Sequence, residues 1–173
     1  MVYRQICSTT KEMEAFLVKL KLTACPHCKR TGSLIRHGFL RGYEEKNHHQ
    51  KTVRAHRVFC SNRNRQVGCG HTFSVWLANK IRRLLLSADS LWAFLKQAVT
   101  SGNKLQAFRD LKSGLSDSTP YRIWKRFQAA QSAIRTALQP LCEPPQIPSP
   151  QPAALTVAHL EAAYQVTLQT FCL

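Results

Sequence analysis

Two cysteine pairs decide the fold, in the stretches Cys25-Pro26-His27-Cys28 and Cys60-Ser61-Asn62-Arg63-Asn64-Arg65-Gln66-Val67-Gly68-Cys69-Gly70-His71. The first stretch is a C-x2-C knuckle, whose tight turn places two thiolates on one side at the spacing that a tetrahedral zinc ion needs. The second stretch supplies two more thiolates, and a strand-like run lies beside each pair. The sequence therefore predicts one structural zinc site with four ligands, Cys25, Cys28, Cys60 and Cys69.

The spacing of the second pair leaves an alternative open. Eight residues separate Cys60 from Cys69, whereas about two to four are usual within a knuckle. Either residues 62–66 bulge out as a basic loop, or His71 or His56 replaces one cysteine as a ligand. We favour ligation by the four cysteines, because zinc knuckles with four thiolates are a common closed site.

The predicted metal has no catalytic position. A redox role for the C-x-x-C motif would require a helix that starts after a strand inside an α/β unit, and this segment lacks one. Four protein ligands leave no open coordination position, so the ion would fold a region with too small a core rather than activate water. The other cysteines, Cys7, Cys142 and Cys172, have no partners in the sequence and are expected as core or free thiols.

The charge of the chain points to a polyanionic partner. Its 173 residues include 25 lysines and arginines against 9 aspartates and glutamates, a net charge of +16. Thirteen of the basic residues lie in residues 25–83 and none in residues 142–173, which an evenly solubilising surface would not produce. Because no basic amphipathic helix in this region suits a membrane surface, we favour nucleic acid.

The chain shows no sign of membrane insertion or export. No apolar run is long enough to span a membrane, and the N-terminal residues lack the apolar segment of a signal peptide. We therefore expect a cytoplasmic, nucleoid-associated protein. The hydrophobic share of 44% allows a packed core.

Strand-like runs surround the cysteines. Candidates are residues 33–37, 53–59 and 72–76, and the second of these alternates apolar and polar residues. Residues 41–51 are expected to form a mobile turn between strands. Before them, a short amphipathic helix is predicted within residues 1–22, capped by Thr9 or Thr10, with one apolar face formed by Met13, Phe16, Leu17 and Leu20.

The second half of the chain has helical periodicity. Three helices are predicted, over residues 88–100 with Ser87 as N-cap, over residues 104–112, and from near Ser116 to about Leu138. Residues 140–152 contain six prolines and are expected to form a stiff linker before a last helix over residues 155–168. The predicted fold class is α+β. It consists of an N-terminal helix (1–22), a small zinc β-ribbon (23–79), a three-helix helix-turn-helix bundle (80–141) and a proline-rich tail with a C-terminal helix (142–173).

The third helix of the bundle is the candidate for reading DNA. Its start fits Ser116 as an N-cap and Pro120 in the first turn, where proline is tolerated. N-terminal residues of a recognition helix meet base edges, so Arg122 is expected to pair with a guanine. The alternative is a solvated basic face on an ordinary bundle helix. The predicted DNA-binding residues of this helix are Ser118, Tyr121, Arg122, Lys125 and Arg126.

These motifs resemble a known family. The segments Cys25-Pro26-His27-Cys28 and Gly68-Cys69-Gly70-His71-Thr72-Phe73, together with residues 32–38 and 57–60, are similar to the N-terminal zinc ribbon of bacterial insertion-sequence transposases. Residues 115–127 resemble the helix-turn-helix that often follows this ribbon, so the similarity covers about residues 23–138. The resemblance implies binding to the DNA of a mobile element, although the long spacing between Cys60 and Cys69 departs from the family pattern.

The catalytic part of those transposases is not expected here. They continue into a ribonuclease-H-like domain with an acidic triad that holds magnesium, whereas this chain continues into a proline-rich stretch. We therefore predict no enzyme. We predict instead a sequence-specific double-stranded-DNA-binding protein that serves transposition or recombination as an accessory factor or regulator, with a transposase or recombinase as a further partner. The ribbon would contact the DNA backbone or minor groove through Arg36, Arg41, Arg54, Arg57, Arg63 and Arg65.

Two alternatives remain at this stage. One is the DNA-binding subunit of a split transposase, which would require a separate catalytic partner. The other is an RNA-binding zinc-ribbon protein, which would require exposed aromatic side chains on a strand face. Phe39, Tyr43 and Trp76 are the candidates for such stacking.

Overall fold

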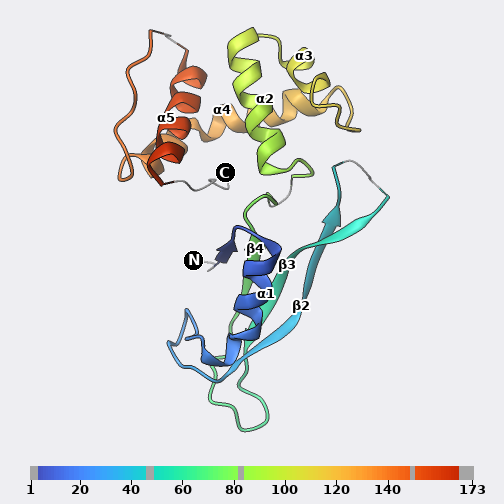
Figure 1. Cartoon of the computed structure of the whole chain (residues 1–173), viewed down its shortest axis with the longest axis vertical. Coiled ribbons are helices and arrows are strands. Elements are labelled where there is room, and N and C mark those ends of the chain that lie inside the picture. The colour runs from blue at the N-terminus through green and yellow to red at the C-terminus, as the bar shows by residue number, and fades with distance from the viewer. Residues whose placement is uncertain (1–3, 46–48, 82–83, 149–150, 168–173) are drawn as a thin grey trace. The chain divides into compact units, whose positions relative to one another are not determined.

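A computed structural model describes residues 4–45, 49–81, 84–148 and 151–167. The chain is a mixed α+β protein that divides into two compact units (Figure 1). The sheet unit consists of Met1–Glu44 and His48–Leu85, and the helical unit consists of Glu45–Asn47 and Leu86–Leu173. The predicted α+β class is confirmed.

The sheet unit is built on four strands. They are β1 (Arg4–Cys7), β2 (Leu34–Tyr43), β3 (Lys51–Cys60) and β4 (Thr72–Leu77), in the order β1-β4-β3-β2. Strands β2, β3 and β4 form an antiparallel meander, and β1 joins its edge in parallel with β4. Each of the three predicted strand runs falls largely or wholly within an observed strand.

The hairpin of β2 and β3 is longer than the sequence suggested. The predicted turn over residues 41–51 is shorter, because β2 continues to Tyr43 and pairs it with Lys51. Residues 46–48, within that predicted turn, lie outside the described residues. Strand β1 was not predicted at all: it has only four residues, and its place is set by pairing with β4 rather than by its own pattern.

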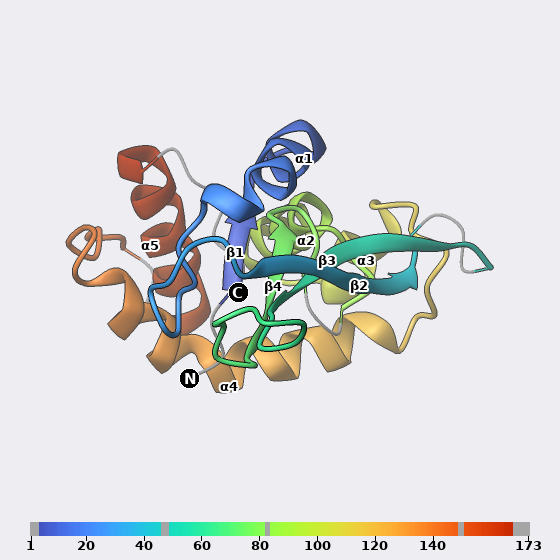
Figure 2. The same ribbon diagram turned by 90° about the horizontal axis from the view of Figure 1, so that it is seen from below.

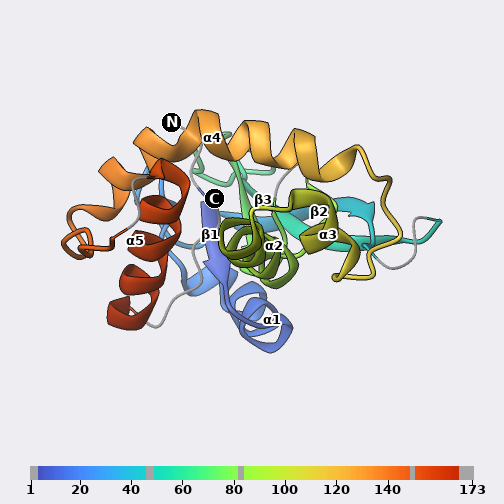
Figure 3. The same cartoon turned by 90° about the horizontal axis from the view of Figure 1, so that it is seen from above.

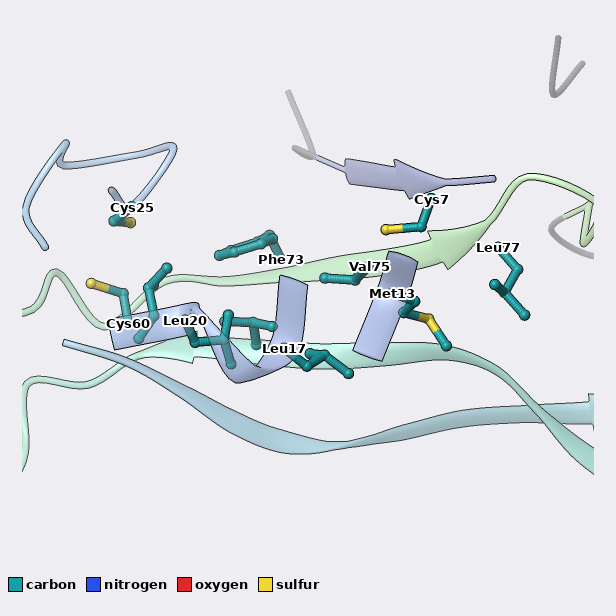
Figure 4. Packing of buried hydrophobic residues seen from close by; sticks show 11 residues of the cluster. Cys7, Met13, Leu17, Leu20, Cys25, Cys60, Phe73, Val75 and Leu77 are labelled. Atoms are coloured by element: carbon teal, nitrogen blue, oxygen red, sulfur yellow. The ribbon is translucent and has the colours of Figure 1, made fainter. Parts of the chain in front are cut away.

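Helix α1 (Thr10–Val18) packs against the sheet (Figure 2). Of the two predicted N-cap candidates, Thr9 rather than Thr10 caps the helix, and its side chain accepts a hydrogen bond from the Glu12 N–H. The buried side chains Met13 and Leu17, with Leu20 in the following 3-10 turn η1 (Leu20–Leu22), pack on apolar residues of β4 (Figure 4). The N-terminal helix therefore belongs to the same core as the strands.

The helical unit contains α2 (Ala88–Ser101), α3 (Lys104–Arg109), α4 (Thr119–Leu138) and α5 (Pro152–Thr167). Ser87 caps α2 as predicted, since its hydroxyl accepts a hydrogen bond from the Ser90 N–H. The helix ends where Gly102 adopts the left-handed conformation, with φ of +69°. Helices α2, α3 and α5 all lie on one side of the long helix α4 (Figure 3).

An aromatic cluster forms the core of this unit. Phe94 of α2 and Phe108 of α3 are fully buried and meet edge to face, with ring centroids 5.8 Å apart. Trp124 of α4 contacts Phe94 in the same manner, and Phe127 of α4 is buried beside it. Helices α2, α3 and α4 therefore contribute aromatic side chains to a common core.

The predicted helix-turn-helix bundle is not confirmed. Helix α3 ends at Arg109, and residues 110–118 connect it to α4, whereas a helix-turn-helix has a turn of about three or four residues. Helix α4 starts later than predicted, with Ser118 rather than Ser116 in the N-cap position. The connection is held instead by an ion pair between Arg109 and Asp117.

Helix α5 extends the helical unit beyond the three predicted bundle helices. It contacts α4 and α2, and buries Thr156 and His159 completely. Arg135 of α4 donates a hydrogen bond to the Thr156 hydroxyl at 2.8 Å, and the His159 Nε2 lies 3.0 Å from the Cys142 carbonyl. The helix starts three residues earlier than predicted, and its predicted end at Leu168 lies outside the described residues. No helix among the described residues is long and apolar enough to cross a membrane.

Candidate metal centre and basic surfaces

The sheet unit brings the four predicted ligands together at one end of the meander. Cys60 is the last residue of β3, Cys69 precedes β4, and Cys25 and Cys28 lie in the loop between η1 and β2. Their four sulfur atoms all lie within 4.8 Å of one another. The four cysteines therefore form a site that can hold a metal ion.

The distances between the sulfur atoms fit tetrahedral coordination. The Sγ atoms of Cys25 and Cys69 are 3.8 Å apart, as are those of Cys28 and Cys60. A tetrahedron with metal–sulfur bonds of about 2.3 Å has edges of about 3.8 Å, whereas a disulfide requires about 2.05 Å. Among the described residues the four thiols are free, so the arrangement is that of a metal site.

A tight turn shapes the first knuckle. The Cys25 N–H donates to the Arg30 carbonyl at 2.9 Å, and the Lys29 N–H donates to the Cys25 carbonyl at 2.8 Å. Lys29 has a φ of +63°, which turns the chain back and directs both sulfurs to the same side. Cys25 is fully buried and is part of the apolar core below the site (Figure 4).

Glycines shape the second knuckle. A Cβ at Gly68 would lie 2.2 Å from the Ser61 carbonyl oxygen, so only glycine fits where these two backbone segments cross. Gly70 has a φ of +74°, and its N–H donates to the Cys60 carbonyl at 2.9 Å. The Cys69 N–H lies 3.3 Å from the Cys60 sulfur and stabilises negative charge on it.

The thiols of the cluster ionise unequally. A hydrogen bond from the Arg30 backbone lowers the pKa of Cys28 to about 7, whereas burial raises the pKa of Cys60 to about 12 and raises that of Cys69. At neutral pH the protein alone therefore does not keep all the thiols deprotonated. A bound cation would do so, since its charge stabilises each thiolate that it coordinates.

The histidines named as alternative ligands lie outside the cluster. The group that can hold a metal ion contains only the four cysteines among the described residues. His71 is exposed: its Nδ1 lies 3.2 Å from the Cys69 carbonyl, and its ring stacks on His27 at 4.8 Å. His56 lies on β3, where its ring meets Phe39. The geometry therefore favours four cysteines over either histidine.

The long spacing between Cys60 and Cys69 forms a basic loop, as the first alternative predicted. The Gly68 N–H closes the loop by donating to the Ser61 carbonyl at 2.9 Å. Asn64 and Arg65 at its tip have positive φ values of +50° and +63°. Arg63 and Arg65 are both exposed, so the insertion presents two charges beside the metal site.

Five of the six arginines predicted to contact DNA in the sheet unit are exposed: Arg36, Arg41, Arg57, Arg63 and Arg65. Among the described residues, no carboxylate forms an ion pair with any of them. They do not share one face of the sheet, however. Arg36 pairs with Val58, which belongs to the core under α1, and Arg57 is the next residue on β3 and points to the opposite face.

The prediction that the sixth arginine, Arg54, contacts DNA is wrong, because its side chain is buried. A shift in register near Arg41 brings it inside, where only 8% of the residue is exposed. Its guanidinium donates to the carbonyls of Leu84 at 2.6 Å and Tyr43 at 3.1 Å, and a third contact reaches Leu85 at 3.3 Å. Burial lowers the pKa of Arg54. Arg54 therefore ties the hairpin to the end of the sheet unit and is not available to DNA.

The residues of α4 that were predicted to bind DNA are all exposed. Ser118, Tyr121, Arg122, Lys125 and Arg126 lie in its first half, on the side away from the buried Ile123 and Phe127. Ser118 makes no side-chain cap hydrogen bond, and the Arg122 guanidinium lies 3.5 Å from the Thr119 hydroxyl. The helix thus presents one polar, basic face, although not within a helix-turn-helix.

Two exposed rings of the hairpin were expected from the sequence only as candidates for stacking on RNA. Phe39 and Tyr43 are 54% and 42% exposed on β2, and each has a cationic side chain over its ring, from Arg41 and Lys51 respectively. The signal was present as an alternation, since Phe39, Arg41 and Tyr43 are spaced two residues apart. The turn predicted from residue 41 onward interrupted this alternation.

Comparisons of the chain with family models, with curated proteins and with solved structures find no match. The similarity to insertion-sequence transposases therefore stays a prediction. What the chain does has to be inferred from its residues and their geometry.

Proposed function

We propose that this chain is a zinc-containing protein that binds double-stranded DNA at specific sequences. In this proposal it serves a mobile genetic element as a regulator or accessory factor and leaves strand cleavage to a partner enzyme. The observation that supports it most directly is the placement of unpaired arginines on and beside the loops that the four cysteines hold together.

A bound metal ion would support this proposal, because it would fix the positions of the arginine side chains near the cysteines. Arg63 and Arg65 lie in the loop between two ligands, Cys60 and Cys69, and the Arg63 guanidinium lies over the Phe59 ring at 5.6 Å. Phe59 and Arg57 share the face of β3 opposite α1. A metal ion at the cysteines would therefore hold these three arginines in a defined arrangement, which reduces the entropy lost on binding phosphates.

Zinc is the metal that the ligand set favours. Four thiolates in a tetrahedral arrangement suit zinc, and a closed set leaves no position for water or substrate. The ion would be structural: the four cysteines bind it, and the N–H groups of Cys69 and Arg30 stabilise their charge.

Helix α4 supplies the second part of the proposed interface. Arg122 and Lys125 project from the exposed face of its first half, and a helix of this size fits the major groove. We propose that Arg122 contacts base edges, whereas Arg57, Arg63 and Arg65 contact phosphates. Arg36 and Arg41 lie on the other face of the sheet and are not part of this duplex contact.

Selection from random duplexes tests the proposal. The zinc-loaded chain is mixed with a random duplex library, and the enriched sites are footprinted and measured by fluorescence anisotropy at two salt concentrations. We expect one enriched motif and a salt-dependent affinity, because each neutralised phosphate releases counterions. Arg57→Ala is compared with Lys11→Ala, which removes one exposed charge from α1. Failure to enrich any motif, or equal effects of both variants, contradicts the proposal.

A further inference from the structure

The face of the β2–β3 hairpin opposite Arg57 carries a feature that the duplex contact does not use. We call it the aromatic stripe: Phe39, Arg41 and Tyr43 on β2, with Lys51 and His56 on β3. Pairing between the strands places these side chains on one face, since Phe39 lies opposite His56 and Tyr43 lies opposite Lys51. His56 follows the alternation that puts Val58 and Cys60 under α1, so the stripe continues the α1 face of the sheet.

The rings of the stripe are unusually exposed. Phe39 and Tyr43 expose 54% and 42% of their surface, although folding normally buries aromatic side chains. Neither ring is isolated: the Arg41 guanidinium lies 5.9 Å from the Phe39 centroid, and the Lys51 ammonium lies 5.0 Å from the Tyr43 centroid. His56 supports Phe39 from the side at 4.8 Å, edge to face. Neighbouring side chains therefore orient each ring, and a cationic group lies next to it.

The alternation along β2 matches the chemistry of an unpaired nucleic acid strand. Residues two apart on a strand are about 7 Å apart, so Phe39 and Tyr43 are separated by about 13 Å with Arg41 between them. Each ring can stack on a separate base, and the cations can pair with the phosphates between those bases. Rings that alternate with positive charge form the usual platform for single strands.

We propose that the aromatic stripe binds a single-stranded segment of nucleic acid by stacking bases on Phe39 and Tyr43. This site goes beyond the proposed duplex contact, which uses the opposite face of the sheet and helix α4. A duplex cannot use the rings, because its bases are already stacked on one another. An acidic peptide could pair with the cations, but it would not depend on the rings being aromatic.

Substitutions that keep or remove aromaticity test the site. The full-length, zinc-loaded chain is titrated into labelled oligothymidylate and oligouridylate of equal length, and anisotropy gives the dissociation constants. Phe39→Leu and Tyr43→Leu should each weaken binding about tenfold. Phe39→Tyr and Tyr43→Phe should bind as the unchanged protein does. Leu22→Ala, which shortens an apolar side chain that is 81% exposed elsewhere in the sheet unit, should have no effect.

A comparison of the two oligonucleotides and a crosslinking experiment test the site further. Equal affinity for both oligonucleotides supports stacking alone, and a preference for one shows that the site also senses the 2′-hydroxyl of the sugar or the 5-methyl group of the base, by which the two strands differ. Iodouracil placed in the bound strand should crosslink to a peptide containing Phe39 or Tyr43. Absence of single-strand binding, binding that survives both leucine substitutions, or crosslinks confined to α4 overturns the site.

The failures of the two proposals are distinguishable. The leucine variants keep Arg57, Arg63, Arg65 and Arg122, so they should retain full affinity for the selected duplex. Loss of duplex binding by Arg57→Ala with intact oligothymidylate binding supports both sites as separate surfaces. If the leucine variants lose duplex and single-strand binding equally, the stripe is not a separate site.

Discussion

The two units of the chain reach stability by different means. The helical unit has an aromatic core in which the buried Phe94 meets Phe108 and Trp124, and Trp124 in turn meets the buried Phe127. The core of the sheet unit is a thin layer between α1 and one face of the meander, and two of its fully buried members are Cys25 and Cys60. At one end of the sheet unit, the place of a larger apolar core is taken by the four thiols.

The sheet unit and the helical unit also differ in charge. The sheet unit carries 16 basic and 3 acidic side chains, whereas the helical unit carries 9 and 6. Mutual repulsion of positive charges opposes compaction of the sheet unit more than that of the helical unit. We therefore expect the fold of the sheet unit to depend on a bound cation and, in the proposed function, its surface to bind a polyanion, whereas the helical unit should fold on its own apolar contacts.

Metal removal should separate the two units most strongly. A chelator, or Cys25→Ser, is expected to unfold the sheet unit, because a structural zinc of this type contributes about 10–16 kcal/mol of binding free energy to folding. Helices α2 to α5 should persist, so far-ultraviolet circular dichroism should keep its helical signal. Amide NMR resonances of β2, β3 and β4 should collapse to random-coil positions.

Cys142→Ser is the matched control for this experiment. Cys142 is a half-buried thiol of the helical unit outside the cluster, so its replacement should leave zinc content and sheet resonances unchanged. Sheet resonances that stay dispersed after complete metal removal would show that the apolar layer under α1 is sufficient, and the comparison between the units would fail.

A cavity in the aromatic core should have the opposite effect. Phe94→Ala removes a fully buried ring that contacts Phe108 and Trp124, and should destabilise the helical unit by about 3–5 kcal/mol. Urea unfolding followed by Trp fluorescence measures this loss. Zinc content, measured by a colorimetric chelator after thiol modification, should remain one ion per chain. Phe94→Ala that releases the metal would show that the two units unfold together.

Within the sheet unit, we expect Arg54 to contribute to stability and Arg57 to contribute to DNA binding. Arg54→Ala leaves the carbonyls of Tyr43 and Leu84 without their donor, which should cost about 3 kcal/mol of stability. Arg57→Ala removes an exposed side chain and should change stability by less than about 0.5 kcal/mol. Its effect should appear in duplex binding at all sequences alike, with the slope of affinity against salt reduced by about one.

Thermal unfolding and salt titrations of the same two variants give both measurements. A stable Arg54→Ala protein with weakened DNA binding would show that Arg54 contacts DNA after all. An Arg57→Ala protein with unchanged affinity and salt slope would remove β3 from the duplex contact.

Local sequence signals were sufficient for most elements of the fold. The apolar periodicity of α2 and the caps Thr9 and Ser87 act within a few residues, so the sequence carries them directly. Strand β1 could not be predicted, because four residues have no clear period and their parallel pairing with β4 depends on a partner about 70 residues away. The connection before α4 was predicted too short, because α3 ends three residues earlier, and α4 begins later, than the apolar periodicity indicated.

In the candidate site, too, some features could be predicted from the sequence and others could not. The ligands Cys25, Cys28, Cys60 and Cys69 were predictable because metal chemistry constrains residue type and spacing. The burial of Arg54 was not, because strict alternation along β3 predicts exposure and only the irregular pairing with β2 turns the side chain inward. That Phe39 and Tyr43 lie exposed on one face follows from the length of the hairpin, which residues 41–51 by themselves do not reveal.

The smallest expected effect separates base contacts from phosphate contacts on DNA. Arg122→Ala should reduce discrimination between the selected duplex and a single-base mismatch by about 1–2 kcal/mol, because a lost base contact lowers the affinity for the correct site only. Lys125→Ala, one turn further along α4, should weaken both duplexes equally. Competition anisotropy with matched and mismatched duplexes measures the difference.

Since α4 is not preceded by a short turn, its approach to the groove differs from that of a helix-turn-helix, and the position of the mismatch that Arg122→Ala tolerates would define that approach. Equal losses for Arg122→Ala and Lys125→Ala would make α4 a phosphate contact like β3, and sequence recognition would then have to lie elsewhere in the chain.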